Sequence, residues 1–331
     1  MLSFIIKRII LMIPTLLVIS FITFIIIQLP PGDYLTTYIT QIAEMGGGVS
    51  PEVLKAAEAM RLRYGLDQPS YIQYWKWISR IVTKGDFGFS FVTLRPISET
   101  IAGLMGNTLI LIVVSAGFIF VVALPIGFYS AVRQYSVGDY LFTFLGFLGL
   151  AVPSFLLALL LLYASYSWFG VVLRGMYSPD MIDAPWSLKK LVDLLKHIWM
   201  PVVAIGGQGI AAVVRVLRNN LLDELEKPYV LTARAKGVRE LRLLIKYPVR
   251  IAVNPLLSTI GHLLPNLFSA AVITSIVLNL PAVGPIFLRA LQDQDMYLTG
   301  SIVMVLAMMT VVGTLVSDIL LALADPRIRY N

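Results

Sequence analysis

The feature that most limits the fold of this chain is a series of six long apolar segments separated by polar stretches. They cover approximately residues 9–27, 108–129, 141–168, 198–216, 256–280 and 299–323. The first would form a helix about 28 Å long, close to the thickness of the hydrocarbon core of a bilayer. Hydrophobic residues make up 58% of the 331 residues and charged residues 14%, whereas soluble domains have about 45–50% and about 25%. The sequence therefore predicts an all-α integral membrane protein with six transmembrane helices.

The distribution of charge predicts how these helices are oriented. Six spans place both ends of the chain on one side of the membrane, where Lys and Arg outnumber the acidic residues, whereas on the other side the two kinds balance. By the positive-inside rule the first side is cytoplasmic. A cleaved signal peptide is the competing interpretation, but the first apolar run exceeds a typical signal core and Leu29-Pro30-Pro31 is not a small-residue cleavage site. We therefore expect a multi-pass membrane protein with cytoplasmic termini.

Changes in polarity along the chain predict three parts. These are residues 1–29 with the first helix, an extracytoplasmic region at 30–106, and a five-helix transmembrane core at 107–331 with a cytoplasmic loop at 218–255. Three glycines at 46–48 predict a flexible tip, and residues 51–63 have the pattern of a short amphipathic helix. A second outer loop, 170–197, is expected to lie along the membrane surface or to meet a partner.

The polar segment between the fourth and fifth apolar segments contains helix start and stop signals. Pro228 suits the first position of a helix, where its missing N–H is not needed, and Gly237 suits a left-handed turn at a helix end. Beyond the glycine, Leu241, Leu244 and Ile245 recur at helical spacing. The segment is therefore predicted to form a helix, a glycine turn and a second helix that together act as a cytoplasmic docking element.

The residue order of this segment, Tyr229-Val-Leu-Thr-Ala-Arg-Ala-Lys-Gly237, resembles the cytoplasmic signature loop of ABC-transporter permeases. It is similar to the version in the first permease subunit of dipeptide, oligopeptide and nickel importers. Further motifs that carry the resemblance are Leu66-Asp67-Gln68-Pro69, Tyr74-Trp75-Lys76-Trp77, Gly85-Asp86-Phe87-Gly88-Phe89-Ser90, Arg95-Pro96-Ile97 and Asp325-Pro326-Arg327-Ile328-Arg329. The chain departs from the family at Pro281-Ala-Val-Gly284, which lacks the first glycine of a Pro-Gly-x-Gly turn, and at Tyr247, where the family usually has histidine.

The resemblance implies a type I ABC importer permease in the cell membrane of a bacterium or archaeon, which forms a translocation pathway with a second, homologous permease subunit. A solute-binding protein outside and two ATPase subunits inside would complete the assembly. ATP and Mg would be bound by the ATPases, and this chain would bind no cofactor and no nucleic acid. The first helix of the signature loop would fit a cleft on an ATPase, with small alanines allowing close approach and Arg234 and Lys236 pairing with acidic groups. The expected docking residues are Tyr229, Thr232, Ala233, Arg234, Ala235, Lys236 and Gly237.

The cargo follows from the resemblance alone. Importers with this kind of permease carry di- or oligopeptides most often, and others carry oligosaccharides, opines or nickel complexes. The selection resides largely in the binding protein, so the permease sequence leaves the substrate open.

Polar residues within the apolar segments indicate a packed bundle. The fifth segment is the most polar, and His262, Asn266 and Ser269 fall on one helical face at positions i, i+4 and i+7. This face either lines the translocation pathway or makes hydrogen bonds between helices of the bundle. Prolines within the segments predict kinks at Pro14, Pro125, Pro153, Pro201 and Pro265.

The motifs that the chain lacks restrict its chemistry. It has no Gly-Lys dipeptide and hence no phosphate-binding P-loop, and neither a His-Glu-x-x-His nor a Gly-x-Ser-x-Gly motif. It also has no cysteine and two histidines, so neither disulfides nor a structural metal site are expected. We therefore predict a transport subunit and not an enzyme. An ion-coupled secondary carrier or a static membrane assembly protein are the alternatives, and a carrier would have buried carboxylates or an inverted repeat.

Overall fold

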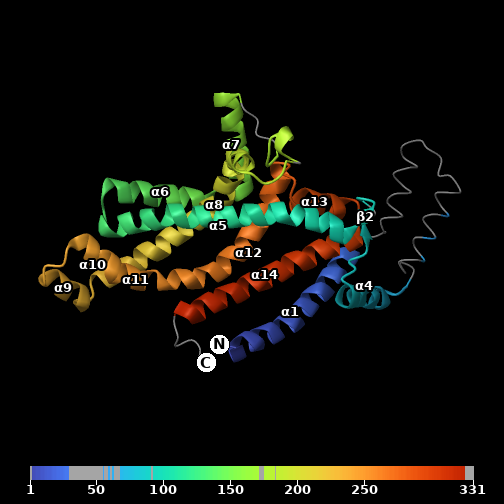
Figure 1. The fold of residues 1–331 in the computed structure, drawn as a ribbon, viewed down its shortest axis with the longest axis horizontal. Helices are drawn as coiled ribbons and strands as arrows, with labels where there is room; N and C mark the ends of the chain where they lie inside the picture. Colours follow the sequence, from blue (N-terminus) through green and yellow to red (C-terminus); the bar gives the residue numbers. More distant parts are fainter. Residues whose placement is uncertain are drawn as a thin grey trace. The chain divides into compact units, whose positions relative to one another are not determined.

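The computed structural model describes residues 2–29, 68–90, 92–170, 175–182 and 184–324, with isolated positions at 55, 59 and 62. The described chain is almost entirely helical (Figure 1). Its elements are α1 (Leu2–Gln28), α4 (Ser70–Lys84), β1 (Phe89–Ser90), β2 (Arg95–Pro96), α5 (Ile97–Val132), α6 (Val137–Ala151), α7 (Ser154–Phe169), η1 (Pro179–Met181), α8 (Leu188–Leu225), α9 (Pro228–Ala235), α10 (Glu240–Lys246), α11 (Pro248–Ala252), α12 (Asn254–Val277), α13 (Val283–Gln292) and α14 (Met296–Ala324). The predicted all-α class is confirmed. The glycines at 46–48, most of 51–63 and the motif at 325–329 lie outside the described residues.

Four of the described helices are long and apolar enough to cross a membrane: Ile5–Ile26, Ile97–Val132, Leu188–Leu225 and Met296–Ile319. A fifth span results if the bent pair α6 and α7 is taken as one. Helix α12 corresponds to the remaining predicted segment and contains a shorter apolar stretch, Leu263–Val277. The described residues therefore give four or five spans by length and composition, and the count of six stays a prediction.

The third predicted span consists of two helices, α6 and α7, which meet at an angle of 108°. Pro153 lies at the break, and Val152 before it has extended backbone with φ −90° and ψ 119°. Proline keeps the preceding residue out of the helical region, so α6 ends at Ala151. The freed carbonyl of Val152 accepts a hydrogen bond from Gln208 Nε2 of α8 at 3.3 Å. The expected kink is a complete break, whereas four prolines lie inside helices: Pro14, Pro125, Pro201 and Pro265.

Helix α8 extends beyond the predicted segment at both ends. Ser187 caps its first turn, with Oγ accepting a hydrogen bond from Lys190 N at 3.3 Å. The preceding loop folds back onto this turn, since Ser178 N and Oγ donate to the Asp193 carboxylate at 2.8 and 2.6 Å. Lys190 Nζ donates to the carbonyl of Ala184 at 2.6 Å. Residues 188–197 of the predicted outer loop are therefore helical, because the serine cap starts the helix earlier. The position of this loop at the membrane surface or against a partner stays a prediction.

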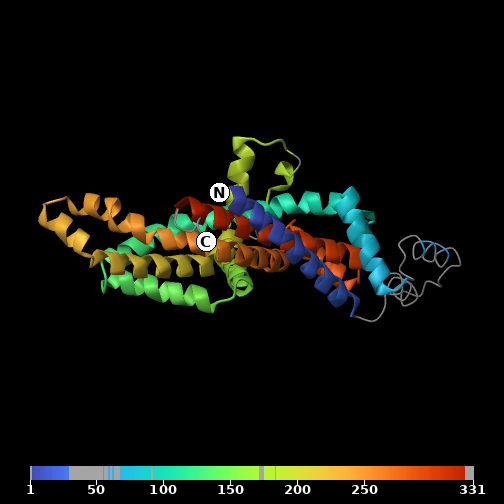
Figure 2. The ribbon, with the colours of Figure 1, turned by 90° about the horizontal axis from the view of Figure 1, so that it is seen from below.

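Contacts divide the chain into two compact units, one of residues 1–9, 107–281 and 310–331 and the other of residues 10–106 and 282–309. In the first unit α8 is central and packs against α6, α7, α11 and α12 (Figure 1, Figure 2). Gly209 allows α5 to approach α8 closely, because a Cβ at this glycine would lie 2.4 Å from Cδ1 of Ile119. This division rests on contacts alone, so the predicted boundaries at residues 29 and 106 stay predictions.

In the second unit, α4 packs against α1 through aromatic side chains. The Tyr74 ring lies edge-on to Phe21 and Phe24, each with a centroid distance of 5.4 Å. The Tyr74 hydroxyl and Ser20 Oγ are hydrogen-bonded at 2.8 Å. Trp77, from the same motif, is only 4% exposed. The aromatic motif at 74–77 therefore joins α4 to the first helix.

The motif at 85–90 forms a compact turn after α4. Gly85 has a φ of +61° and ends α4 with a left-handed cap. Asp86 Oδ1 accepts a hydrogen bond from Gly88 N at 2.8 Å, and Gly88 has a φ of +95°, which a side chain would strain. The chain then enters the short antiparallel pair of β1 and β2. The two glycines are therefore required by backbone geometry.

Asp295 fastens this turn to the start of α14. Its carboxylate is fully buried and accepts hydrogen bonds from Ser90 Oγ at 2.8 Å and Val92 N at 3.1 Å. The other carboxylate oxygen accepts from Leu298 N at 3.0 Å, in the first turn of α14. One carboxylate thus joins two segments that are far apart in the sequence, since Ser90 and Asp295 are 205 residues apart.

Candidate functional site

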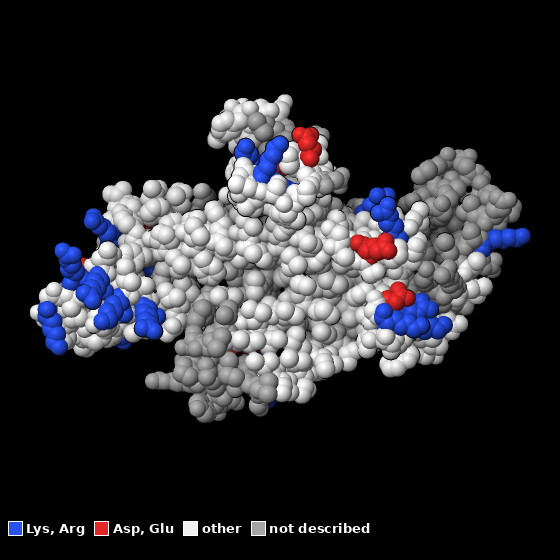
Figure 3. Space-filling view, in the orientation of Figure 1, with Lys and Arg blue, Asp and Glu red and all other residues white. Residues whose placement is uncertain are grey.

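The predicted helix, glycine turn and helix are present. Helix α9 starts at Pro228. Helices α10 and α11 follow the turn and are separated by Tyr247 alone. In Figure 1 this segment lies beyond one end of α8 and α12, and Figure 2 agrees. Figure 3 shows Lys and Arg side chains gathered over the same end. The signature segment is therefore a projecting, basic, helical hairpin.

Gly237 closes α9 with a complete Schellman motif. Its φ is +75°, its N–H donates to the carbonyl of Arg234 at 3.0 Å, and Val238 N donates to the carbonyl of Ala233 at 3.3 Å. Nothing lies within 4 Å of a Cβ built at Gly237. The need for glycine here therefore comes from backbone conformation and not from lack of space.

The inner face of α9 is fixed by a small apolar cluster. Val230 is fully buried and Ala233 is 8% exposed, and they pack with Leu243 and Leu244 of α10. Four half-buried side chains surround this cluster: Phe128, Leu225, Val238 and Tyr247. The cluster ties the hairpin to the ends of α5 and α8, so α9 is held in place by its own chain.

The outer face of α9 is open. Six of the seven predicted docking residues are exposed: Tyr229, Thr232, Arg234, Ala235, Lys236 and Gly237. The seventh, Ala233, is buried in the apolar cluster. It therefore supports α9 from within and does not belong to the outer face, because Leu243 and Leu244 of α10 cover it. Sequence reasoning missed Leu231, which is 53% exposed and lies one helical turn before Ala235 on the same face.

Two polar contacts order the edges of α9. Arg234 forms a two-pronged ion pair with Glu240, with Nε–Oε2 and Nη2–Oε1 distances of 3.2 and 2.6 Å. This pairing lowers the pKa of the Glu240 carboxyl and raises that of Arg234. The Tyr229 hydroxyl donates to Glu224, and partial burial together with this acidic neighbour raises the pKa of Tyr229 to about 12. Arg234 thus has an acidic partner in its own chain, whereas Lys236 forms no ion pair among the described residues.

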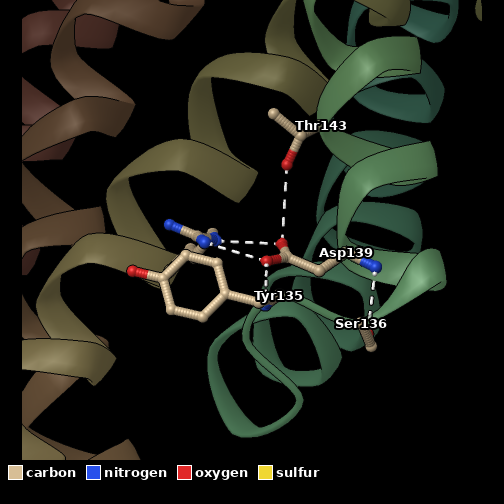
Figure 4. A network of polar contacts seen from close by, with 5 residues as sticks. Tyr135, Ser136, Asp139 and Thr143 are labelled. Atoms are coloured by element: carbon tan, nitrogen blue, oxygen red, sulfur yellow. Dashed lines mark hydrogen bonds and ion pairs between the residues drawn. The ribbon is translucent and has the colours of Figure 1, made fainter.

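A buried ion pair fixes the helix that leads into this hairpin. Arg218 of α8 binds the Asp139 carboxylate of α6 through both prongs, Nε–Oδ1 at 3.0 Å and Nη2–Oδ2 at 2.9 Å (Figure 4). Tyr135 N also donates to this carboxylate at 3.0 Å, and Ser136 caps α6 by accepting from Asp139 N at 3.2 Å. Asp139 is 2% exposed. Sequence reasoning used these charges only for membrane orientation. The serine three residues before an aspartate marked the helix start, but nothing local pointed to Arg218.

The predicted polar face of the fifth segment lies on α12. Asn266 and Ser269 are exposed in the isolated chain, and Ser269 Oγ donates to the carbonyl of Pro265 in its own helix at 3.3 Å. Neither side chain forms a hydrogen bond to another helix among the described residues. The backbone of His262 is helical, and its side chain lies outside the described part.

Two protein-family models match this chain. The model described as "Binding-protein-dependent transport system inner membrane component" matches residues 123–330, and the model for the N-terminal part of such membrane components matches residues 1–112. The chain belongs to this family. Its membership, which the motifs predicted, is therefore confirmed, and with it an all-helical permease of the ABC-importer type.

Curated relatives cover the whole chain. The oligopeptide transport system permease protein AppB of Bacillus subtilis (strain 168) is 33% identical over 339 residues, covering 100% of both chains. The dipeptide transport system permease protein DppB of Alkalihalophilus pseudofirmus is 29% identical over 344 residues, again with 100% coverage of both. The glutathione transport system permease protein GsiC of Salmonella typhimurium is 29% identical over 331 residues, with the same coverage. Because the family match at 123–330 contains α9 to α12, the hairpin and the polar helix both belong to the transporter component.

Proposed function

We propose that this permease is a subunit of an ATP-driven importer of di- or oligopeptides, and that the outer face of α9 docks onto an ATPase subunit. The relatives named above as oligopeptide, dipeptide and glutathione permeases support the peptide cargo. Oligosaccharides, opines and nickel complexes are the other cargoes of the same kind of machinery.

The observation that carries this proposal is the two-sided construction of α9. Its inner face is packed on Leu243 and Leu244, whereas its outer face presents the exposed Leu231 beside small and basic side chains. A leucine more than half exposed on a projecting helix is an anchor for a partner that covers it. A helix held by its own chain transmits a push without unfolding.

The proposed assembly contains a second homologous permease, two ATPases that bind ATP and Mg, and an extracytoplasmic solute-binding protein. In it, both termini and α9 lie in the cytoplasm. ATP-driven closure of the ATPases pushes α9, and α8 carries the displacement into the bundle as a rigid-body transition between two states. Asn266 and Ser269 line the pathway with His262 in this proposal. The assignment is supported by the side chains of Asn266 and Ser269, which form no hydrogen bond to another helix within the described part of the chain.

The test is co-purification of tagged full-length chain from native membranes, with ATP-dependent uptake of a labelled tripeptide measured in parallel. Leu231→Asp places a charge on the outer face of α9, and we expect it to lower both the recovered ATPase and the uptake by about tenfold or more. Leu188→Asp is the matched control. That leucine is 78% exposed at the first position of α8, where an acidic residue suits the helix start.

Three outcomes separate the parts of this proposal. Recovery of the ATPases with Leu231→Asp at the wild-type level would contradict docking through this face. A wild-type chain that purifies without any ATPase would contradict the importer itself and favour a secondary carrier. Recovery of the whole assembly without ATP-dependent uptake of peptide, but with uptake of another solute class, would correct the cargo only.

A further inference from the structure

An apolar groove runs beside the docking hairpin and is distinct from the outer face of α9. Its volume is about 310 Å³, within the range of small-molecule sites. Phe128 of α5 and Leu217 of α8 contribute to its lining, and Leu217 is 2% exposed. Leu241 and Ile245 of α10 also line it, and they are 63% and 58% exposed. The described chain thus leaves large apolar side chains uncovered around a hollow.

One wall of the groove is a regular row of aliphatic residues. Leu241, Ile245, Val249 and Val253 all line it and recur at every fourth position. The row continues through the break at Tyr247, between the end of α10 and the start of α11. Two short helices therefore present a single apolar edge to the same hollow.

A row of cations runs parallel to this edge. Arg242, Lys246 and Arg250 each follow a groove residue directly in the sequence, so they recur with the same spacing and lie about 100° around the helix from it. All three are exposed. None forms an ion pair among the described residues, and Lys246 Nζ lies 5.5 Å from the centroid of the Tyr247 ring. The charged end visible in Figure 3 contains this part of the hairpin.

Helix α4 provides a natural comparison for this arrangement. Lys76, Arg80 and Lys84 have the same spacing there. The apolar residues next to them, however, are turned into the protein: Trp77 is 4% and Ile81 9% exposed. On α4 the cation row therefore borders a filled interface, whereas on α10 and α11 it borders an open groove.

We propose that the groove binds one anionic phospholipid molecule, with an acyl chain along Leu241, Ile245, Val249 and Val253 and the phosphate against Arg242, Lys246 and Arg250. A lipid with a negative headgroup satisfies the apolar edge and the basic row with a single ligand. Basic rows at a membrane surface attract anionic headgroups, and amphipathic helices bury their apolar side among acyl chains. This site is independent of the proposed cargo and of docking through α9.

The experiment uses the full-length chain in its purified native assembly, stripped of lipid by detergent. Phosphatidylglycerol or phosphatidylcholine with identical acyl chains is then added, and the bound molecules are counted by native mass spectrometry. We expect one phosphatidylglycerol to be retained about tenfold or more tightly than phosphatidylcholine. That preference should be lost in the triple variant Arg242→Gln, Lys246→Gln and Arg250→Gln. Val249→Trp fills the groove, and it should weaken the binding of both lipids.

The matched control is Lys76→Gln with Arg80→Gln and Lys84→Gln, which removes the same charge from α4 and should leave the preference unchanged. Equal binding of the two lipids by wild type, or an equal loss with the α4 variant, would overturn the proposal. The proposal would also be overturned if Val249→Trp bound lipid like the wild type but lost the second permease or an ATPase. A protein, and not a lipid, would then occupy the groove. Lipid binding is counted directly, so failure of peptide uptake does not affect this test.

Discussion

Two arginine–carboxylate pairs, one at the end of α8 that leads into the helical hairpin and one within the hairpin, have nearly the same geometry and very different surroundings. Arg218 holds Asp139 at 3.0 and 2.9 Å, and Arg234 holds Glu240 at 3.2 and 2.6 Å, in both cases through Nε and one terminal nitrogen. The side chains of the first pair are 23% and 3% exposed, and those of the second 46% and 53%. Geometry alone therefore does not distinguish them, and burial does.

The difference in burial matches a difference in what each pair joins. Asp139 and Arg218 are 79 residues apart and connect α6 to α8, whereas Arg234 and Glu240 are six apart and connect α9 to α10. Removing one partner of a buried pair leaves an uncompensated charge, which costs about 3–5 kcal/mol. An exposed pair is screened by water and contributes about 0.2–1 kcal/mol. The first pair fixes the position of α8 against α6, and the second stabilises only the local turn between α9 and α10.

The largest effect is expected for Asp139→Ala, which should destabilise the chain by about 3–5 kcal/mol because Arg218 loses its buried counter-charge. Thermal unfolding of the purified assembly measures this loss. The double variant Asp139→Leu with Arg218→Met should recover much of it, since neither charge then remains. A loss below about 1 kcal/mol for the single variant would place the pair in the same class as Arg234 and Glu240.

The comparison is sharpened by Asp295, a carboxylate as buried as Asp139 that accepts hydrogen bonds from Ser90 Oγ and Val92 N. We expect Asp295→Asn to cost about 1–3 kcal/mol, because an amide cannot accept with both of its polar atoms. The same unfolding assay applies, and Ser90→Ala should cost less than Asp295→Asn. A larger effect for the serine variant would show that the hydroxyl, not the carboxylate, fastens the turn.

Within the hairpin, Gly237→Val tests backbone conformation instead of charge. A side chain at φ +75° is strained, and the expected cost is about 1–2 kcal/mol. Gly237→Asn should cost clearly less, because asparagine tolerates the left-handed region. Measuring stability and ATPase recovery for the two variants separates a strained turn from a lost contact. If valine and asparagine had equal effects, the presence of any side chain at position 237 would matter more than the backbone φ.

The smallest effect is expected for Glu240→Gln, a loss of about 0.2–1 kcal/mol at neutral pH. The hydrogen bond from Arg234 lowers the pKa of Glu240 in the folded chain. The stabilisation is therefore complete above the unfolded value of about 4.3 and is lost as the pH falls through the lower folded pKa. The difference in unfolding temperature between wild type and Glu240→Gln should be present at pH 7 and should shrink as the pH falls below the unfolded value. A difference that grows on acidification would reverse the sign of this linkage.

Local signals explain why the hairpin could be predicted from the sequence. Pro228, Gly237 and the spacing of Leu244 act within a few residues, and the observed start, cap and second helix follow them. The role of Ala233 could not be predicted, because its burial depends on which side of α9 the leucines of α10 cover. The motif at 85–90 was apparent as a pattern, but its partner Asp295 lies far away in the sequence. The same holds for Arg218, whose partner no local pattern indicates.

The broken span has a consequence for how such chains can recombine. The turn between α6 and α7 exposes the carbonyl of Val152, and Gln208 on a different helix hydrogen-bonds it. In a hydrocarbon environment a carbonyl without a donor is costly. A chimaera with an unbroken third span would leave the Gln208 amide without its acceptor. A chimaera with an α8 that has no donor at position 208 would leave the Val152 carbonyl without its hydrogen bond. Positions 152 and 208 should therefore be exchanged together in such chimaeras, although 56 positions separate them.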